Sequence, residues 1–149
     1  MMHKLPVSVL VVVHTAALEI LLLERAQRAG FWQSVTGSLD WPEETLEAAA
    51  AREVLEETGI DAALGVLSRW NAANTFEIYT QWRHRFAPGV RYNTEHVLGL
   101  RLAQRAPVAL APQEHVAFAW LPWKEAAQRC FSWSNRDAIR LLAERHVIP

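Results

Sequence analysis

Three glutamates in the middle of the chain have a spacing that suits the binding of a divalent cation. Glu56 and Glu57 stand three and four residues after Glu53, so on an α-helix all three side chains share one face. Like charges at this spacing destabilise a helix, and Arg52 is their one local counter-charge. Hard cations take oxygen ligands, so a bound cation would make the cluster favourable. The spacing predicts a metal site with Glu53 and Glu57 as ligands and Glu56 as a further ligand or base, although a solvated acidic face has the same pattern.

The helix that carries these glutamates has recognisable start and stop signals. Asp40 can cap a first turn, Pro42 suits an early helical position, and Glu43 follows Asp40 by three residues as in a capping box. Gly59 supplies a C-terminal stop. These signals predict a helix near residues 41–58.

Most of the remaining pattern is that of β-strands. The run VSVLVVV at Val7–Val13 is mostly β-branched and, apart from Ser8, apolar, as expected of a strand covered on both faces. Ser134–Glu144 has an apolar face typical of a closing helix. Strands flanked by two helices, without regular alternation of the two, predict an α+β fold in a single domain, residues 1–149. The other predicted strands are Glu19–Arg25, Phe31–Thr36, Leu64–Trp70, Phe76–Phe86, Glu95–Arg101 and Val116–Trp120.

Composition narrows the class of partner. The net charge of the 149-residue chain is −1, which gives no general attraction to nucleic acid or to an anionic membrane. The apolar run Leu5–Val13 is too short to span a bilayer. The single cysteine, Cys130, cannot form an internal disulfide, which fits a reducing cytoplasm. We therefore expect a cytoplasmic protein whose partner is a small molecule, with no nucleic acid and no membrane.

The segment around the glutamates resembles the signature of the Nudix hydrolases. Between Gly37 and Glu44 the segment has six residues, where the family pattern has five. From Glu44 onward the match is complete. The resemblance implies a Nudix-type α/β/α sandwich with a mixed central sheet, and a hydrolase that splits a phosphoric anhydride with Mg²⁺, which Mn²⁺ can replace. It also implies that Arg52 holds the carboxylates in place. The matching positions are Gly37, Glu44, Arg52, Glu53, Val54, Glu56, Glu57, Gly59 and Ile60.

Strings outside the signature resemble one branch of that family, the dihydroneopterin triphosphate diphosphatases of bacterial folate biosynthesis. These strings are Phe31–Ser38, Phe76–Ile78, Trp82–Gly89, Asn93–Glu95, Glu114–His115 and Ser132–Arg136. The resemblance implies Mg²⁺-dependent release of pyrophosphate from dihydroneopterin triphosphate, leaving the monophosphate. It implies Glu114 as a metal ligand or general base, and it implies substrate contacts from Lys4, Arg25, Thr36, Phe76, Glu77, Ile78, Tyr79 and Ser132.

Structural explanations compete with several of these roles. Phe76 and Ile78 would also alternate on a buried strand, and Glu114 would also suit an exposed loop. On a strand, Arg83 and Arg85 would share one face, where they could meet phosphate or solvent. For the whole protein, two other functions stay open. One is a housecleaning (d)NTP pyrophosphohydrolase acting on dATP or an oxidised purine nucleotide, and the other is a non-catalytic nucleotide-binding Nudix module.

Overall fold

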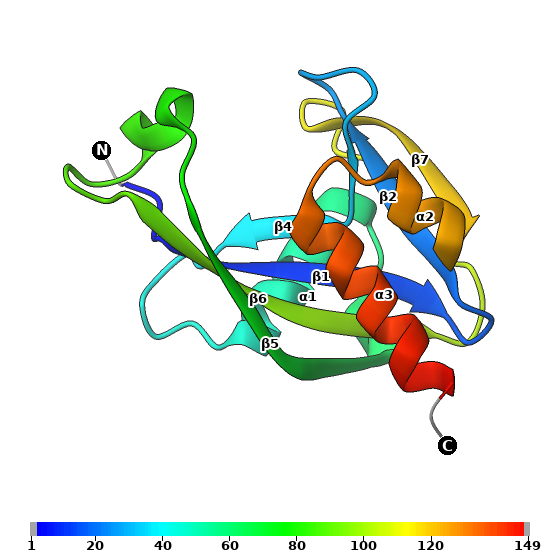
Figure 1. Ribbon diagram of the computed structural model, residues 1–149. Helices are drawn as coiled ribbons and strands as arrows, with labels where there is room; N and C mark the ends of the chain where they lie inside the picture. The colour runs from blue at the N-terminus through cyan, green and yellow to red at the C-terminus, as the bar shows by residue number, and fades with distance from the viewer. Residues whose placement is uncertain (1–2, 148–149) are drawn as a thin grey trace.

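The computed structural model describes residues 3–147, so residues 1, 2, 148 and 149 of the predicted domain lie outside the described part. Strands and helices alternate irregularly along the chain, as Figure 1 shows. The elements are β1 (Val7–Thr15), β2 (Glu19–Arg25), β3 (Trp32–Gln33), β4 (Val35–Ser38), α1 (Leu46–Thr58), η1 (Ala62–Leu64), β5 (Val66–Glu77), η2 (Thr80–Arg85), β6 (Tyr92–Leu102), β7 (His115–Pro122), α2 (Trp123–Arg129) and α3 (Trp133–Val147).

The strands form one mixed sheet with β1 near its centre. The order is β3-β2-β1-β6-β5, with β4 also paired to β1 and β7 also paired to β2. The pairing of β1 with β6 is parallel, from Val7 opposite Thr94 to Thr15 opposite Leu102. The other strand pairs are antiparallel. The mixed central sheet implied by the sequence is confirmed.

Helices cover both faces of this sheet, as the ribbon in Figure 1 shows for α1 behind it and α3 in front. On one face, Val9 and Val11 of β1 pack with Val54 of α1. On the other, Leu10 packs with Ile139 of α3. From Val9 to Val13 strand β1 is apolar at every position because each face meets a different helix layer. The α/β/α sandwich is confirmed.

Helix α1 begins later than its sequence signals predict. Its N-cap is Thr45, whose Oγ1 accepts a hydrogen bond from the backbone N–H of Ala48 at 3.1 Å. The predicted start at residue 41, with Asp40 as cap, is wrong. The backbone N–H of Asp40 instead donates to Glu44 Oε1 at 2.8 Å, within a turn that directs Glu44 towards α1. The end of the helix at Gly59, which has φ 72°, is confirmed.

The predicted strand at Phe76–Phe86 is wrong beyond Glu77. Strand β5 ends at Glu77, and the six-residue 3₁₀ helix η2 follows, so Arg83 and Arg85 do not alternate on a strand. We call residues 79–91 the η2 lobe; it projects from the sheet at the upper left of Figure 1. Helix α2 has no counterpart among the predicted elements. Of the described helices, none has the length and apolar character needed to cross a membrane.

Candidate metal and phosphate site

The side chain of Glu57 lies at the centre of the candidate site. It projects from α1, is 2% exposed, and accepts a hydrogen bond from the backbone N–H of Thr36 in β4. Its Oε1 lacks a hydrogen-bond partner among the described residues and lies 3.9 Å from His115 Nδ1. One ligand atom from each of Glu57, Glu114 and His115 lies within 4.8 Å of the others. Helix α1 and the start of β7 thus bring three potential metal ligands together.

Arg52 holds the acidic part of α1 in place. Its guanidinium donates to Glu53 Oε1 at 2.7 Å, to both carboxylate oxygens of Glu44 at 3.0 Å, and to the carbonyl oxygen of Ser38 at 3.1 Å. The Glu44 side chain is 1% exposed, and its hydrogen bond from Arg52 lowers its pKa. Arg52 therefore ties α1 to the preceding loop and fixes the position of Glu53.

The acidic groups are held at an electrostatic cost that a cation would relieve. Burial, followed by contact with Glu53, raises the pKa of Glu57 to about 10. Burial also raises the pKa of Glu53. Burial and the charge of Arg25 lower the pKa of His115 to about 4, so its imidazole is neutral near pH 7 and able to bind a metal. The buried carboxyl group of Glu57 with its unpaired oxygen, the partly buried one of Glu53 and a neutral histidine fit a divalent cation.

These pKa values predict that the metal-free protein loses stability as the pH rises. In the unfolded chain Glu57 releases its proton near its usual pKa of 4.5, whereas the folded protein retains it up to about 10. The folded state binds more protons within that window, so the free energy of unfolding falls with increasing pH. His115 has the opposite effect, but only between about pH 4 and 6.5.

Urea unfolding with a chelator at pH 7 and pH 9 measures this effect without interference from His115. We expect a lower free energy of unfolding at pH 9, and a smaller difference in Glu57→Gln. Equal values at both pH values in the wild-type protein would contradict the raised pKa of Glu57.

Gly37 makes room for the Glu53 carboxyl group. A Cβ atom placed on Gly37 would overlap the Glu53 side chain. Any side chain at this position of β4 would require the Glu53 side chain to move, so the Gly–Glu pair of the signature is a packing contact.

Gly37→Ala is expected to displace Glu53 and to lower kcat by about 10- to 100-fold, the range for groups that orient metal ligands. Steady-state kinetics at saturating metal measures the loss. Gly30→Ala is the control for adding a methyl group where there is room, since nothing lies within 4 Å of a Cβ at Gly30. Its φ of 83° means that this control variant also carries some backbone strain. Wild-type turnover in Gly37→Ala would show that the position of Glu53 is not critical.

Basic side chains lie around the acidic group. Lys4 is close enough to Glu53 and Glu114 for their charges to raise its pKa, although burial and Arg85 lower it overall. Burial, then the charge of Arg85, lowers the pKa of Arg25, which also interacts with Glu57. Lys4 and Arg25, which lie near these acidic groups, and Arg85 beside them are suited to phosphate, whose charge a bound metal would share.

The other predicted catalytic residue, Glu56, lies at the edge of this arrangement. Its side chain is 55% exposed, and it lies 3.7 Å from the Arg52 guanidinium. Of the residues predicted to contact substrate, Thr36 and Phe76 are partly buried and Ile78 is buried. Thr36 lies opposite Leu10 in the register of β4 and β1, so its side chain faces the α3 side of the sheet.

Three further predicted residues have structural contacts of their own. Glu77 lies 3.3 Å from Arg91 and 3.4 Å from Arg83, within the η2 lobe and its base. Tyr79 is 59% exposed and packs edge-on against Trp82. Ser132 Oγ accepts from the backbone N–H of Asn135 at 3.2 Å, as an N-cap of α3 does. The structure does not bring these three side chains into the acidic cluster.

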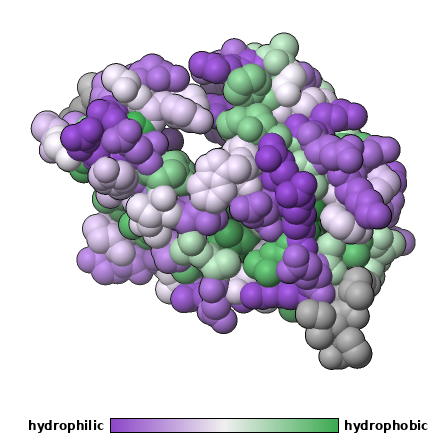
Figure 2. Space-filling model, in the orientation of Figure 1, coloured by the Kyte–Doolittle hydropathy of each residue, from purple (hydrophilic) through white to green (hydrophobic). Residues whose placement is uncertain are grey.

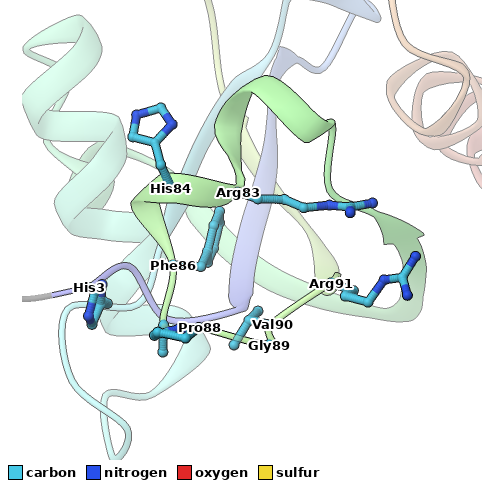
Figure 3. A pocket seen from close by; sticks show the side chains of 9 residues that line it. His3, Arg83, His84, Phe86, Pro88, Gly89, Val90 and Arg91 are labelled. Atoms are coloured by element: carbon cyan, nitrogen blue, oxygen red, sulfur yellow. The ribbon is translucent and has the colours of Figure 1, made fainter.

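The η2 lobe also carries a separate pocket, of about 620 Å³ (Figure 3). Arg83, His84 and Phe86 line it on one side and residues 87–91 on the other, with His3 at its rim. None of the acidic residues of the cluster lines it. In Figure 2 a notch separates this lobe from the rest of the molecule, above the sheet.

Sequence reasoning missed the contributions of His115 and Glu44. The position of His115 next to Glu114 in the sequence was the one feature that could have indicated a role in the site. Its burial next to Glu57 depends on the pairing of β7 with β2, which the local sequence does not show. Glu44 matches the family signature, but the signature alone does not indicate what its side chain does. In the structure it forms an ion pair with Arg52.

Comparison with known proteins agrees with this geometry. The model of the NUDIX domain matches residues 4–142. The chain belongs to the Nudix family. Members of this family generally use a divalent metal, and the acidic group of this Nudix protein could hold one.

Its relatives are similar over nearly their whole length. The Nudix protein is 43% identical to the dihydroneopterin triphosphate diphosphatase of Escherichia coli (strain K12), over 92% of this chain and 91% of that protein. It is 33% identical to the enzyme of the same name from Haemophilus influenzae, over 94% and 89%. The solved structure of the E. coli dihydroneopterin triphosphate pyrophosphohydrolase superposes with a TM-score of 0.86, at 40% identity over 97% of this chain and 99% of that one.

Proposed function

We propose that this protein is a Mg²⁺-dependent diphosphatase that hydrolyses dihydroneopterin triphosphate to dihydroneopterin monophosphate and pyrophosphate. The observation that carries the proposal is the group formed by Glu57, Glu114 and His115, surrounded by Lys4 and Arg25. Identity of 43% to a dihydroneopterin triphosphate diphosphatase over nine-tenths of both chains supports the choice of substrate.

The proposed roles follow from the positions of the side chains. Glu57 and Glu114 would hold the metal with His115 as a neutral group, joined by Glu53 beside Glu57, and Glu56 would lie at the exposed edge. When bound, Mg²⁺ supplies positive charge against the phosphate oxygens and favours ionisation of water. Manganese, which accepts the same oxygen ligands, can replace it.

The protein's own groups would bind and orient the triphosphate. Lys4 and Arg25 donate to phosphate oxygens and stabilise the charge that develops on the departing pyrophosphate. Glu114 is exposed and reaches the cluster from a loop, so it can accept the proton of the attacking water and release it to solvent. Arg52 acts as a positioning residue through its hydrogen bonds to Glu53 and Glu44.

The pterin ring would lie on the α3 side of the sheet. Thr36 connects the two parts of the site, because its backbone bonds Glu57 while its side chain faces that side. Phe76 offers an aromatic face for stacking, and Ile78 an apolar wall. We assign Glu77, Tyr79 and Ser132 to the outer contacts of the substrate.

We further propose that residues 1–149 act as one domain in the cytoplasm. The family match covers residues 4–142, and one sheet joins the strands of the described part. Cys130 is buried and unpaired, and burial raises the pKa of its thiol to about 12, so no disulfide is needed for folding.

Pyrophosphate release from dihydroneopterin triphosphate, dATP and oxidised dGTP tests the function directly. We expect the highest kcat/KM for the pterin substrate, activity with Mg²⁺, and none with a chelator. A large advantage for a nucleotide would instead identify a housecleaning hydrolase. No release from any triphosphate would identify a binding module.

Glu114→Ala is expected to reduce kcat or metal affinity by about 10- to 100-fold, since it removes a ligand or base. Kinetics over a Mg²⁺ titration separates the two effects. Glu125→Ala, which removes an exposed carboxylate of α2, is the matched control. Unchanged kinetics in Glu114→Ala would make Glu114 an ordinary loop residue.

A further inference from the structure

Strand β6 carries two buried hydrogen-bond acceptors that the proposed catalytic roles do not use. The side chains belong to Glu95, which is 7% exposed, and Asn93, which is 6% exposed. Glu95 Oε1 and Asn93 Oδ1 each lack a hydrogen-bond partner among the described residues. A buried acceptor without a donor costs free energy of roughly 1–3 kcal/mol. Glu57 Oε1 is in the same state, at a site where a ligand is expected.

Both side chains lie on the face of the sheet that is covered by α3. Alternate residues of a strand point to the same face, and Val97, two residues after Glu95, packs in the α3-side core. The rest of each side chain is anchored. Asn93 Nδ2 donates to Ser8 Oγ at 2.8 Å, and Ser134, in the first turn of α3, hydrogen-bonds to Glu95. The two free oxygens are therefore held in fixed positions.

The neighbours of the pair are those proposed to receive the pterin ring. In the register of β5 and β6, Phe76 lies opposite Asn93, and Asn74 lies opposite Glu95. A pocket of about 370 Å³ opens beside this row, between Asn74 and Val97 of the sheet and residues 137–144 of α3. Asn74, the cross-strand partner of Glu95, lines this pocket, whereas Glu95 itself lies buried beside it.

The distance from the metal site suits a substrate with a triphosphate tail. Strand β4, which bonds Glu57 through Thr36, is separated from β6 by β1 alone. Two strand spacings amount to about 10 Å within the sheet. Glu57 comes from α1 and Glu95 faces α3, so a substrate with phosphates at Glu57 and its ring at Glu95 must also reach from one face of the sheet to the other, which the length of a triphosphate on a three-carbon side chain serves.

We propose that Glu95, supported by Asn93, binds the donor edge of the pterin ring, formed by its ring N–H and its 2-amino group. This inference rests on the proposed function and adds how the substrate is selected. Two acceptors match two N–H donors, a pattern shared by pterin and guanine. Adenine presents a ring nitrogen acceptor next to its amino group, so one of its atoms would face an acceptor. The site should therefore reject adenine nucleotides.

Glu95→Gln tests this assignment at nearly constant volume, since it replaces one acceptor oxygen with an NH₂ donor. We expect kcat/KM for dihydroneopterin triphosphate to fall about 100-fold, mainly through KM. GTP and ITP differ only in the 2-amino group, so their kcat/KM ratio reports on edge recognition. The wild-type protein should favour GTP by about tenfold, and the variant should lose that preference. Glu125→Gln, the same change on the exposed face of α2, should leave both quantities unchanged.

A second measurement needs no variant. In the wild-type protein, neopterin should inhibit competitively at a concentration at least about tenfold lower than the corresponding lumazine, in which oxygen replaces the 2-amino group. Equal inhibition, or an unchanged GTP/ITP ratio in a folded Glu95→Gln, would overturn the role of Glu95 and leave the diphosphatase assignment intact. Failure of the wild-type protein to hydrolyse dihydroneopterin triphosphate would overturn the proposed function, while loss of the GTP preference in Glu95→Gln would still support edge recognition.

Discussion

Replacing Glu57 with glutamine is expected to lower kcat by at least about 100-fold, because the change removes the central carboxylate of the proposed metal site. Steady-state pyrophosphate release at saturating Mg²⁺ measures the loss. Glu47→Gln is the matched control, since Glu47 is on the same helix but pairs with the exposed Arg69 outside the cluster. Near-normal turnover in Glu57→Gln would exclude Glu57 from the mechanism.

Stability should respond to the same substitution in the opposite direction. In the metal-free protein, Glu57 is buried beside Glu53 and has an unpaired oxygen. The folded wild-type protein must take up a proton at Glu57, whose pKa is raised to about 10, whereas glutamine is neutral at nearly constant volume, so the metal-free variant should melt at or above the wild-type temperature near pH 7. Mg²⁺ should raise the melting temperature of the wild-type protein and have little effect on the variant. Parallel increases in both proteins would show that the ion binds elsewhere.

Local sequence patterns predict the parts of the fold that depend on neighbouring residues. The β-branched run at Val7–Val13 predicts a strand buried on both faces, and Gly59 ends α1 where a left-handed residue is needed. The start of α1 was misplaced because Asp40 and Thr45 are both good capping residues. The pair formed by Arg52 with Glu44 decides between them, since it bends residues 40–44 away from the helix axis. That pair is a tertiary contact.

The six-residue spacer has a structural explanation in the same loop. The backbone N–H of Asp40 donates to Glu44 Oε1, and the Asp40 side chain lies 3.2 Å from Arg52. The longer loop therefore folds against the guanidinium and leaves Glu44 buried at its centre. Spacing relative to Arg52, rather than to Gly37, is what the ion pair requires.

The sequence predicts the part of the site that lies on one helix, but not the part that depends on how distant strands pair. Helical spacing places Glu53 and Glu57 on one face whatever the fold, so their proximity follows from sequence. Glu114 and His115 reach them only because β7 adds to the edge of the sheet at β2. The 3₁₀ helix at Thr80–Arg85 was missed because no glycine or proline within it marks the end of the alternation that begins at Phe76, whereas Pro88 and Gly89 do mark the loop that follows.

Arg52→Met is expected to reduce the free energy of unfolding by about 3–5 kcal/mol, the usual effect of removing one partner from a buried ion pair. The substitution leaves the Glu44 carboxylate 1% exposed and without its guanidinium, and it frees Glu53. For a chain of this length the melting temperature should fall by about 10 °C. Thermal and urea unfolding of the metal-free protein measure the change, and kcat should fall with it because Glu53 is no longer oriented.

Two further variants distinguish loss of the buried pair from loss of a large side chain. Arg69→Met removes an arginine whose pair with Glu47 is nearly half exposed on both sides, so it should change the free energy of unfolding little. Adding Glu44→Gln to Arg52→Met removes the stranded charge and should restore part of the stability. If the double variant were no more stable than Arg52→Met, the penalty would come from lost packing of the arginine stem. The position of Arg52 in the signature would then reflect its contact with Glu53 and the carbonyl oxygen of Ser38 rather than the charge of Glu44.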